Sequence, residues 1–395
     1  MILPETVTIV DSGAFHRSSL QNVIMSDNVK SINSYAFSNT PLSSIDLPDS
    51  LMHIGDQAFA STSIDHLEIP SKVKVLSYRT FYNCPLTKIK FHEGLQEIKE
   101  EALSVENIDT LVFPSTLRKI GRLIDYVENE VSCRYVEFKQ GDEPLELGDN
   151  CFINFVNLNT AILPDNLVRL GVACFAYTGL RQITIPSLID TIPSRCFANC
   201  HLLGKVDLPF GLSVIGDRAF AETPLLEETT IPATLTYIGD KAFKTLSPGG
   251  LKEVDIYCET PPIIGDAAFD KQDSILIRVP CGKIPTYISA PIWNNYTNFR
   301  YEDCVGTMEY EILNLRVFPN PVVNILHIEY DSSQPSVCVN ITDLNGHCVM
   351  ARTFQTESST ININLSSLNN GIYLLTLSEK NGEIVFHQKI IKYKS

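Results

Sequence analysis

Short segments in which apolar and polar residues alternate recur along the first part of the chain. In residues 63–70, SIDHLEIP, Leu67 and Ile69 fall on one side and His66 and Glu68 on the other, which predicts a β-strand with one buried face. Proline cannot donate a backbone hydrogen bond to a neighbouring strand, so Pro70 predicts the end of this strand. An apolar residue followed by proline recurs at Leu47-Pro48, Ile69-Pro70, Phe113-Pro114, Leu163-Pro164, Ile185-Pro186, Leu208-Pro209, Ile231-Pro232 and Val279-Pro280.

A second recurring segment ends in phenylalanine. SVIGDRAF (residues 213–220) returns as TYIGDKAF (236–243) and has an earlier copy, MHIGDQAF (52–59). Aligned on this last residue, the copies follow each other mostly at 22 or 23 residues, at Phe15, Phe37, Phe59, Phe81, Leu103, Phe152, Phe175, Phe197, Phe220, Phe243 and Phe269. One such unit cannot bury its own apolar residues, but stacked units can, with each phenylalanine resting on the next.

These two periods predict a mainly β chain that begins with a solenoid of the leucine-rich-repeat class. We expect about a dozen units of 22–23 residues over residues 1–280, with their strands in a parallel sheet. The interval from Leu103 to Phe152 holds a degenerate unit. There STLRKIGRLI (115–124) resembles the first half of a repeat, and RYVEFKQ (134–140) supplies the next strand.

The 11 cysteines are too few and too widely spread for a disulfide scaffold in a chain of 395 residues. Three of them, Cys151, Cys174 and Cys196, stand just before the repeated phenylalanine, where other units have alanine. A small buried thiol can replace a small buried methyl group, so we predict that these cysteines pack in the core. Cys84 and Cys200 follow the phenylalanine at a turn and are also expected to be buried and unreactive.

The pattern changes near residue 308, where the phenylalanine repeat stops. Short alternating segments separated by turn residues follow, and Asn345-Gly346 and Asn381-Gly382 are strong signals for two-residue hairpins. Six or seven strands in about 85 residues predict a small, immunoglobulin-like β-sandwich. We therefore divide the chain into a solenoid (1–280), a cap and linker (281–310) and a β-sandwich (311–395).

Both parts resemble known families. LPDSLMHIGDQAFASTSIDHLEIP (47–70) is similar to BspA-like leucine-rich repeats, which occur in surface proteins of Bacteroidetes and some parasites, and the resemblance covers roughly residues 3–280. VPCGKIPTYISAPIWNNYTNF (279–299) resembles the segment that closes such arrays, which implies that Trp293 covers the last unit. Cys281 and Cys304 flank this segment and are the pair that we expect to form a disulfide; the alternative is two free thiols.

The last part of the chain resembles the type A C-terminal sorting domain of the type IX (Por) secretion system. The resemblance rests on VFPNPVVNILHI (317–328), ITDLNGHCV (341–349), LNNGIYLLTL (368–377) and KIIKYK (389–394), in this order. It implies that residues 311–395 engage the secretion machinery and carry the protein out of a Gram-negative bacterium, to the outer-membrane surface or the medium. The N-terminus lacks the basic and apolar regions of a secretory signal, and we expect that a leader has been removed.

The solvent-facing strand positions are the residues that the solenoid does not dictate. Their middle is less charged, with Val112, Tyr135 and Ile162, and an acidic cluster of Asp207, Glu228, Glu253 and Asp255 lies toward the later units. Exposed apolar side chains are plausible anchors for a ligand, although the same positions could also form a solvated face without a partner. The candidate binding residues are Lys88, Lys90, Val112, Tyr135, Glu137, Ile162, Thr184, Asp207, Glu228 and Asp255.

Charge and motifs narrow the possible functions. The net charge of −15 argues against nucleic acid as a partner, and no segment is apolar enough for a membrane helix. We find no nucleotide-binding, metal-ligating or catalytic motif, and therefore expect no cofactor, no metal and no enzymatic activity.

The hypothesis is a secreted or surface-attached adhesion protein, whose solenoid face binds a host extracellular protein, a glycan or a neighbouring cell. A structural spacer or coat protein is the alternative. A hydrolase with its site between Leu103 and Phe152 is a third and weaker possibility.

Overall fold

In the computed structural model the chain forms two units, Met1–Cys304 and Val305–Ser395. The structure describes residues 1–124, 131–246, 248–269, 274–301, 316–319, 322–329, 336–343, 348–355, 360–378 and 384–392. The prediction of a mainly β solenoid followed by a small β domain is confirmed.

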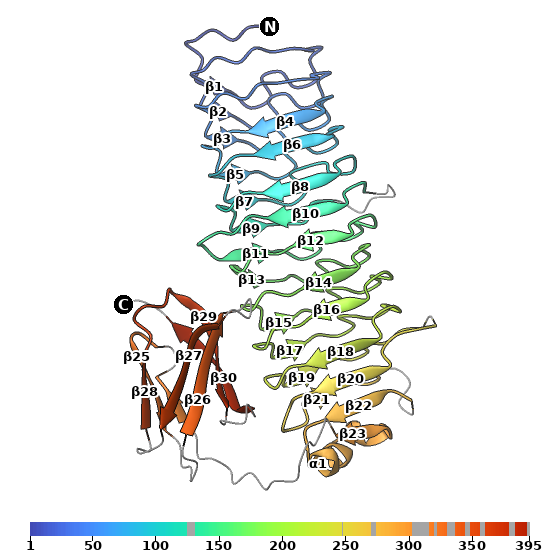
Figure 1. Cartoon of the computed structure of the whole chain (residues 1–395). Helices are drawn as coiled ribbons and strands as arrows, with labels where there is room; N and C mark the ends of the chain where they lie inside the picture. The colour runs from blue at the N-terminus through green and yellow to red at the C-terminus, as the bar shows by residue number, and fades with distance from the viewer. Residues whose placement is uncertain are drawn as a thin grey trace. The chain divides into compact units, whose positions relative to one another are not determined.

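The first unit is a column of stacked rungs, each of which is one repeat of the chain, and two rows of parallel strands run along it (Figure 1). The longer strands form the first row: β4 (His66–Ile69), β6 (Lys88–Phe91), β8 (Thr110–Phe113), β10 (Tyr135–Phe138), β12 (Thr160–Ile162), β14 (Gln182–Thr184), β16 (Lys205–Asp207), β18 (Glu228–Ile231), β20 (Glu253–Ile256), β22 (Leu276–Val279) and β23 (Phe299–Tyr301). Seven of these strands, β4, β8, β12, β14, β16, β18 and β22, end at or just before the apolar residue of an apolar-proline pair, as the sequence predicts.

Shorter strands form the second row: β1 (Ile9–Val10), β2 (Ser31–Ile32), β3 (His53–Ile54), β5 (Val75–Leu76), β7 (Glu97–Ile98), β9 (Lys119–Ile120), β11 (Leu145–Leu147), β13 (Leu167–Arg169), β15 (Thr191–Ile192), β17 (Val214–Ile215), β19 (Tyr237–Ile238) and β21 (Ile263–Ile264). They contribute the isoleucine of the repeated phrase to the core, and Ile192, Ile215 and Ile238 are fully buried. The sequence analysis did not separate this second row from the turn that follows it.

The repeated phenylalanines lie inside the column and stack on one another. Phe197 is buried, and its ring centroid lies 5.6 Å from that of Phe175 and 5.3 Å from that of Phe220, with nearly parallel planes. The stacked pairs run from Phe15 to Phe81 and again from Phe152 to Phe269. Between the two stacks, buried Leu103 pairs with Phe81, and rings from β8 and β10 continue the core.

Each residue of the repeated motif Ile-Gly-Asp-x-Ala-Phe has a structural role. A Cβ atom on Gly216 would lie 2.6 Å from the backbone nitrogen of Ser194, so only glycine fits between these rungs. The carboxylate of Asp217 accepts a hydrogen bond of 2.9 Å from the backbone N–H of Asp240 in the next rung. Residue x has a left-handed backbone conformation, with φ of 55° at Arg218, and Ala219 and Phe220 are buried. The motif therefore recurs because every rung makes the same contacts with the rungs before and after it.

The cysteines of the solenoid pack as predicted. Cys84, Cys151, Cys174, Cys196 and Cys200 are buried free thiols. Burial raises the pKa of Cys200 to about 11, although hydrogen bonding to Thr178 acts in the opposite direction. The thiol of Cys200 is therefore neutral at physiological pH, and all five cysteines serve as small buried side chains.

The rung that ends in Leu103 contains a buried ion pair. Glu101 is buried and accepts hydrogen bonds from the guanidinium groups of Arg79 and Arg122. Arg79 also lies over the ring of Tyr82, with its Cζ atom 4.5 Å from the ring centroid. The following residues 125–130, within the interval where a hydrolase site was considered, lie outside the described residues.

A short helix, α1 (Ile284–Ser289), and a 3-10 helix, η1 (Trp293–Asn295), close the column after β22. Trp293 is buried 6.0 Å from the ring of Phe269, and its indole N–H donates a hydrogen bond of 2.7 Å to the carbonyl oxygen of Pro262. The predicted position of Trp293 over the last rung is thus confirmed. Cys281 is disulfide-bonded, but Cys304 lies outside the described residues, so their pairing stays a prediction.

The second unit contains two antiparallel sheets, ordered β24-β25-β28 and β27-β26-β29-β30. Its strands are β24 (Arg316–Phe318), β25 (Ile325–Glu329), β26 (Ser336–Asp343), β27 (Cys348–Gln355), β28 (Thr360–Asn364), β29 (Gly371–Ser378) and β30 (Ile384–Lys392). Leu326, Ile341, Ile363 and Leu375 from both sheets share one buried core, which is the arrangement of a sandwich. The predicted Asn345-Gly346 and Asn381-Gly382 turns lie outside the described residues, between strands that pair antiparallel.

Candidate ligand-binding surface

The exposed side of the first strand row is a broad surface, which we call the sheet face. It consists of the outward side chains of β4, β6, β8, β10, β12, β14, β16, β18, β20, β22 and β23. Two outward positions of each strand align in register across paired strands, for example Val112 with Glu137 and Glu137 with Ile162. All ten candidate residues lie on this face, Lys88, Tyr135 and Glu228 in one of the two outward rows and the other seven in the second.

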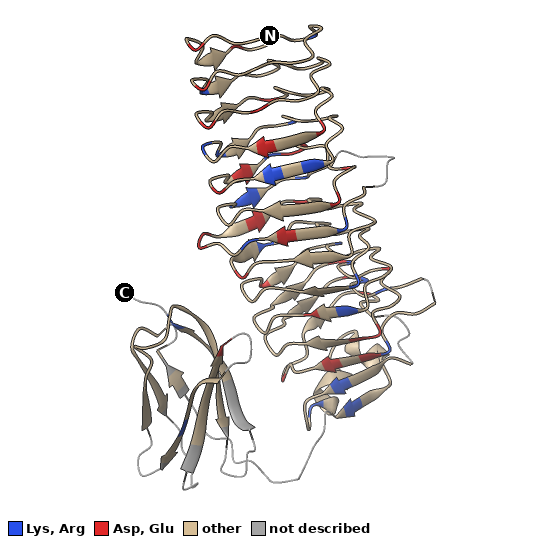
Figure 2. Ribbon diagram, turned by 45° about the horizontal axis from the view of Figure 1, so that its top comes forward, with Lys and Arg blue, Asp and Glu red and all other residues tan. Residues whose placement is uncertain are grey.

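Toward the N-terminal end, the charges of the sheet face pair between neighbouring strands (Figure 2). Lys90 Nζ lies 3.0 Å from the carboxylate of Glu68, and His92 Nε2 lies 3.1 Å from the same oxygen. These two hydrogen bonds hold the pKa of Glu68 below its usual value. The predicted binding residue Lys90 is therefore already partnered within the sheet.

The acidic cluster predicted at the other end is partly neutralised. Arg278 of β22 lies 2.8 Å from Asp255 and 2.6 Å from Glu253, and these two contacts raise the pKa of Arg278. Asp207 lies 3.3 Å from Lys205 and accepts a hydrogen bond from Thr184. Lys205 and Arg278 thus offset part of the negative charge of the cluster, whereas Glu228 has no ion pair among the described residues.

The middle of the sheet face carries few charges. Val112 is 37% exposed and Ile162 is 46% exposed, although both lie in strands. Between them, the hydroxyl group of Tyr135 donates a hydrogen bond of 2.8 Å to Glu137, and this bond raises the pKa of Tyr135. The strands β8, β12 and β14, which are described in full, carry no ionisable side chain.

A groove crosses this middle region where the hydrogen bonding of the row is interrupted. β10 pairs with β12 and β14 pairs with β16, but β12 and β14 belong to different hydrogen-bonded sheets. A cavity of about 640 Å³ lies between them, with Thr160, Ile162, Gln182 and Thr184 among its lining residues. The sequence analysis nominated Ile162 and Thr184 but did not predict a groove, because the loss of pairing leaves no mark in the residue types.

The described residues contain no group of three or more histidine, cysteine, aspartate or glutamate side chains that could hold a metal ion. Within the same residues, no helix is both long and apolar enough to cross a membrane. The sheet face presents apolar side chains and hydroxyl groups in the middle and ion pairs at both ends.

The fold and this surface define a repeat solenoid with a wide exposed sheet and a separate C-terminal β-sandwich. Residues 8–124 and 128–248 match the BspA type leucine rich repeat region in six copies, and residues 316–393 match the secretion system C-terminal sorting domain. The chain belongs to the BspA-type leucine-rich-repeat family. With its sorting domain, it is a protein that is exported to the cell surface or secreted.

One solved structure supports the fold, and a second is similar to a lesser degree. A leucine-rich repeat protein from Bacteroides ovatus is 22% identical with a TM-score of 0.52, and the match covers 76% of this chain and 83% of that one. The pneumococcal vaccine antigen PcpA is 19% identical with a TM-score of 0.44, over 76% of this chain and 88% of its own. A comparison with curated protein sequences finds no match. The two matching families are a repeat region and a sorting domain, and neither is described as an enzyme.

Proposed function

We propose that the protein is an adhesion protein of the cell surface, whose sheet face binds a host extracellular protein, a glycan or a neighbouring cell. The observation that carries this proposal is the groove between β12 and β14, next to the exposed side chain of Ile162. The core of the solenoid needs only the inward residues of these strands. Exposed apolar side chains beside a groove cost solubility and contribute little to folding, so their natural role is contact with a partner.

Binding is expected to depend on the middle of the sheet face. Replacing Tyr135 and Ile162 by aspartate places two charges where a partner would bury apolar surface, and each hot-spot substitution of this kind costs roughly 2 kcal/mol or more of binding free energy. A screen of the purified protein against extracellular-matrix proteins, glycans and cells identifies the ligand. Titration of this ligand with the wild type and with the Tyr135→Asp/Ile162→Asp variant then measures the loss of binding free energy. The unfolding curve should stay close to that of the wild type, because both side chains lie outside the core.

Val168 supplies a matched control for this experiment. It lies in β13 of the same rung, on the second strand row, and is 36% exposed. Val168→Asp places one such charge on another face and should bind like the wild type. Unchanged binding by the Tyr135→Asp/Ile162→Asp variant would instead support a spacer or coat protein, and turnover of a peptide or glycoside substrate would support an enzyme.

Export is expected to depend on the second unit. We propose that the outer-membrane surface of a Gram-negative bacterium is the destination. Deletion of residues 315–395 should leave a folded solenoid inside the cell, because the two units have separate cores. Fractionation of the producing organism and the fluorescence of Trp293 measure these two results. Appearance of the truncated protein in the medium would contradict the role of the sorting domain.

A further inference from the structure

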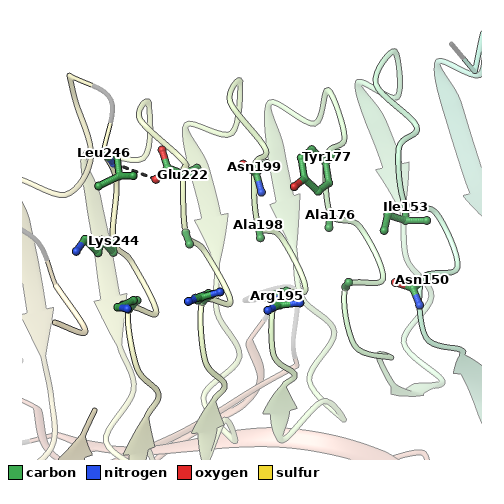
Figure 3. A pocket seen from close by; sticks show the side chains of 14 residues that line it. Asn150, Ile153, Ala176, Tyr177, Arg195, Ala198, Asn199, Glu222, Lys244 and Leu246 are labelled. Carbon is green, nitrogen blue, oxygen red and sulfur yellow. Dashed lines mark hydrogen bonds between the residues drawn. The ribbon is translucent and has the colours of Figure 1, made fainter. Parts of the chain in front are cut away.

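A second groove lies away from the sheet face, along the turns that contain the repeated phenylalanines (Figure 3). Its volume is about 650 Å³, and it crosses consecutive rungs from Asn150 to Leu246. Its floor is made of small side chains, with Ala176 and Ala198 between two rows of larger residues. We call this feature the basic groove.

One edge of the basic groove is a ladder of cations. Arg195, Arg218 and Lys241 occupy the same position of three successive rungs, with φ of 58°, 55° and 55°. The backbone N–H of each donates to a carbonyl oxygen of the next rung at 2.9 Å, so the three side chains leave the column at a regular spacing. Among the described residues, none of the three forms an ion pair, whereas Lys90, Arg134 and Arg278 do.

The carboxylates near this ladder are engaged by the backbone. Asp217 and Asp240 accept N–H groups of the following rungs at 2.9 and 2.8 Å, and Glu222 accepts the N–H of Leu246 at 3.0 Å. Of these three, only Glu222 lines the groove, where it faces four cations that include Lys244. A positive strip on a chain with a net charge of −15 is thus concentrated in one concave place.

The opposite edge carries two neutral groups that suit a sugar, Tyr177 and Asn199, and then Glu222 at the same position of the next rung. Tyr177 is 48% exposed, and Asn199 follows it one rung later. A tyrosine ring provides a flat apolar surface with a polar end, and an asparagine amide can both donate and accept hydrogen bonds with hydroxyl groups. The guanidinium groups across the floor can hold carboxylates or sulfates with two parallel hydrogen bonds.

We propose that the basic groove binds an anionic polysaccharide, whose carboxylate or sulfate groups contact Arg195, Arg218 and Lys241. The phenylalanine rings of these rungs repeat every 5.1–5.6 Å, whereas side chains on one side of an extended peptide repeat at roughly 6.6–6.8 Å, so an acidic peptide would not stay in register with the ladder. Nucleic acid fits less well, because single strands require several stacking rings and the residues that line the groove include one aromatic ring, that of Tyr177.

The test uses the full-length protein and two probes, heparin for sulfate and polygalacturonate for carboxylate, titrated at low salt. The wild type should bind at least one probe and lose affinity as sodium chloride is added. Arg195→Gln/Arg218→Gln should weaken binding about tenfold or more, since each charge-assisted contact contributes about that factor. Asn199→Asp, a nearly isosteric change that adds a negative charge to the groove, should also weaken binding.

Arg17→Gln/Lys72→Gln changes the net charge by the same amount on other rungs and should bind like the wild type. Neutral dextran should not bind. Failure to bind both anionic probes, or equal affinity of the wild type and both groove variants, would overturn the proposal. Equal weakening by the Arg17→Gln/Lys72→Gln control would overturn it too, and tighter, variant-sensitive binding of single-stranded DNA would assign the groove to nucleic acid instead. Ile162→Asp should leave this binding unchanged, which separates it from the sheet face.

Discussion

Replacing Phe197 with alanine is expected to destabilise the solenoid unit by about 3–5 kcal/mol. The ring is fully buried and stacks on Phe175 and Phe220, so truncation removes contacts on both sides and leaves a cavity inside the column. Neighbouring rungs are hydrogen-bonded to each other and cannot move independently to fill it. Because repeat proteins are held together by interfaces between neighbours, the damage weakens both junctions of this rung.

Trp293 allows a direct measurement of this loss. It is the only tryptophan of the chain and is buried in the cap of the solenoid, so its fluorescence during denaturation reports on the first unit. Phe197→Leu should cost less, since Leu103 occupies the same position in the native column. Phe210→Ala, at a side chain that is 69% exposed, should change the free energy of unfolding by less than about 0.5 kcal/mol. A cost of Phe197→Ala as small as that of Phe210→Ala would contradict the stacked core.

Replacing Glu101 with alanine is expected to cost about 3 kcal/mol, at the lower end of the range for a broken buried ion pair. The carboxylate is 1% exposed, whereas the side chains of Arg79 and Arg122 keep 28% and 26% of their surface in water. Removing Glu101 deletes the carboxylate that both guanidinium groups contact and leaves two like charges close together, although water can reach both in part. The rung that ends in Leu103, where other rungs have phenylalanine, is thus stabilised in part by this buried ion pair.

Glu100→Ala is the matched control, because Glu100 is the adjacent exposed glutamate and forms no ion pair among the described residues. It should leave the Trp293 denaturation curve almost unchanged. Combining Glu101→Ala with Arg122→Ala should recover part of the loss, since the second change removes one of the two like charges. If Glu101→Ala and Glu100→Ala had the same small effect, the ion pair would contribute nothing to this rung.

The interior of the solenoid could be predicted from the sequence because it follows simple periods. Phenylalanine at steps of 22 or 23 residues requires equal rungs, and equal rungs place Phe197 and Phe220 in contact. The same alignment explains why Cys174 and Ala219 are interchangeable small core residues. Trp293 was predicted by a different argument, since a final rung must be covered.

The surface was less predictable, because its properties depend on pairs of residues. The acidic residues Glu253 and Asp255 formed a cluster in the sequence, but Arg278 lies beside both once β20 and β22 are in register. The groove at Ile162 lies between β12 and β14, which do not pair, and no residue type marks this interruption in the sequence. The ladder of Arg195 and Arg218 was visible as a repeat, but its exposure depends on the left-handed backbone of that position.

Site-specific photo-crosslinking tests the role of the sheet face most directly. A photoreactive amino acid replaces Ile162 in one variant and Val168 in another, on two faces of the same rung, and each protein is irradiated on the cells or matrix that it binds. Our account predicts crosslinked partner from position 162 and none from position 168. Crosslinking from position 168 alone would show that the partner binds the second strand row, and the assignment of the sheet face would be wrong.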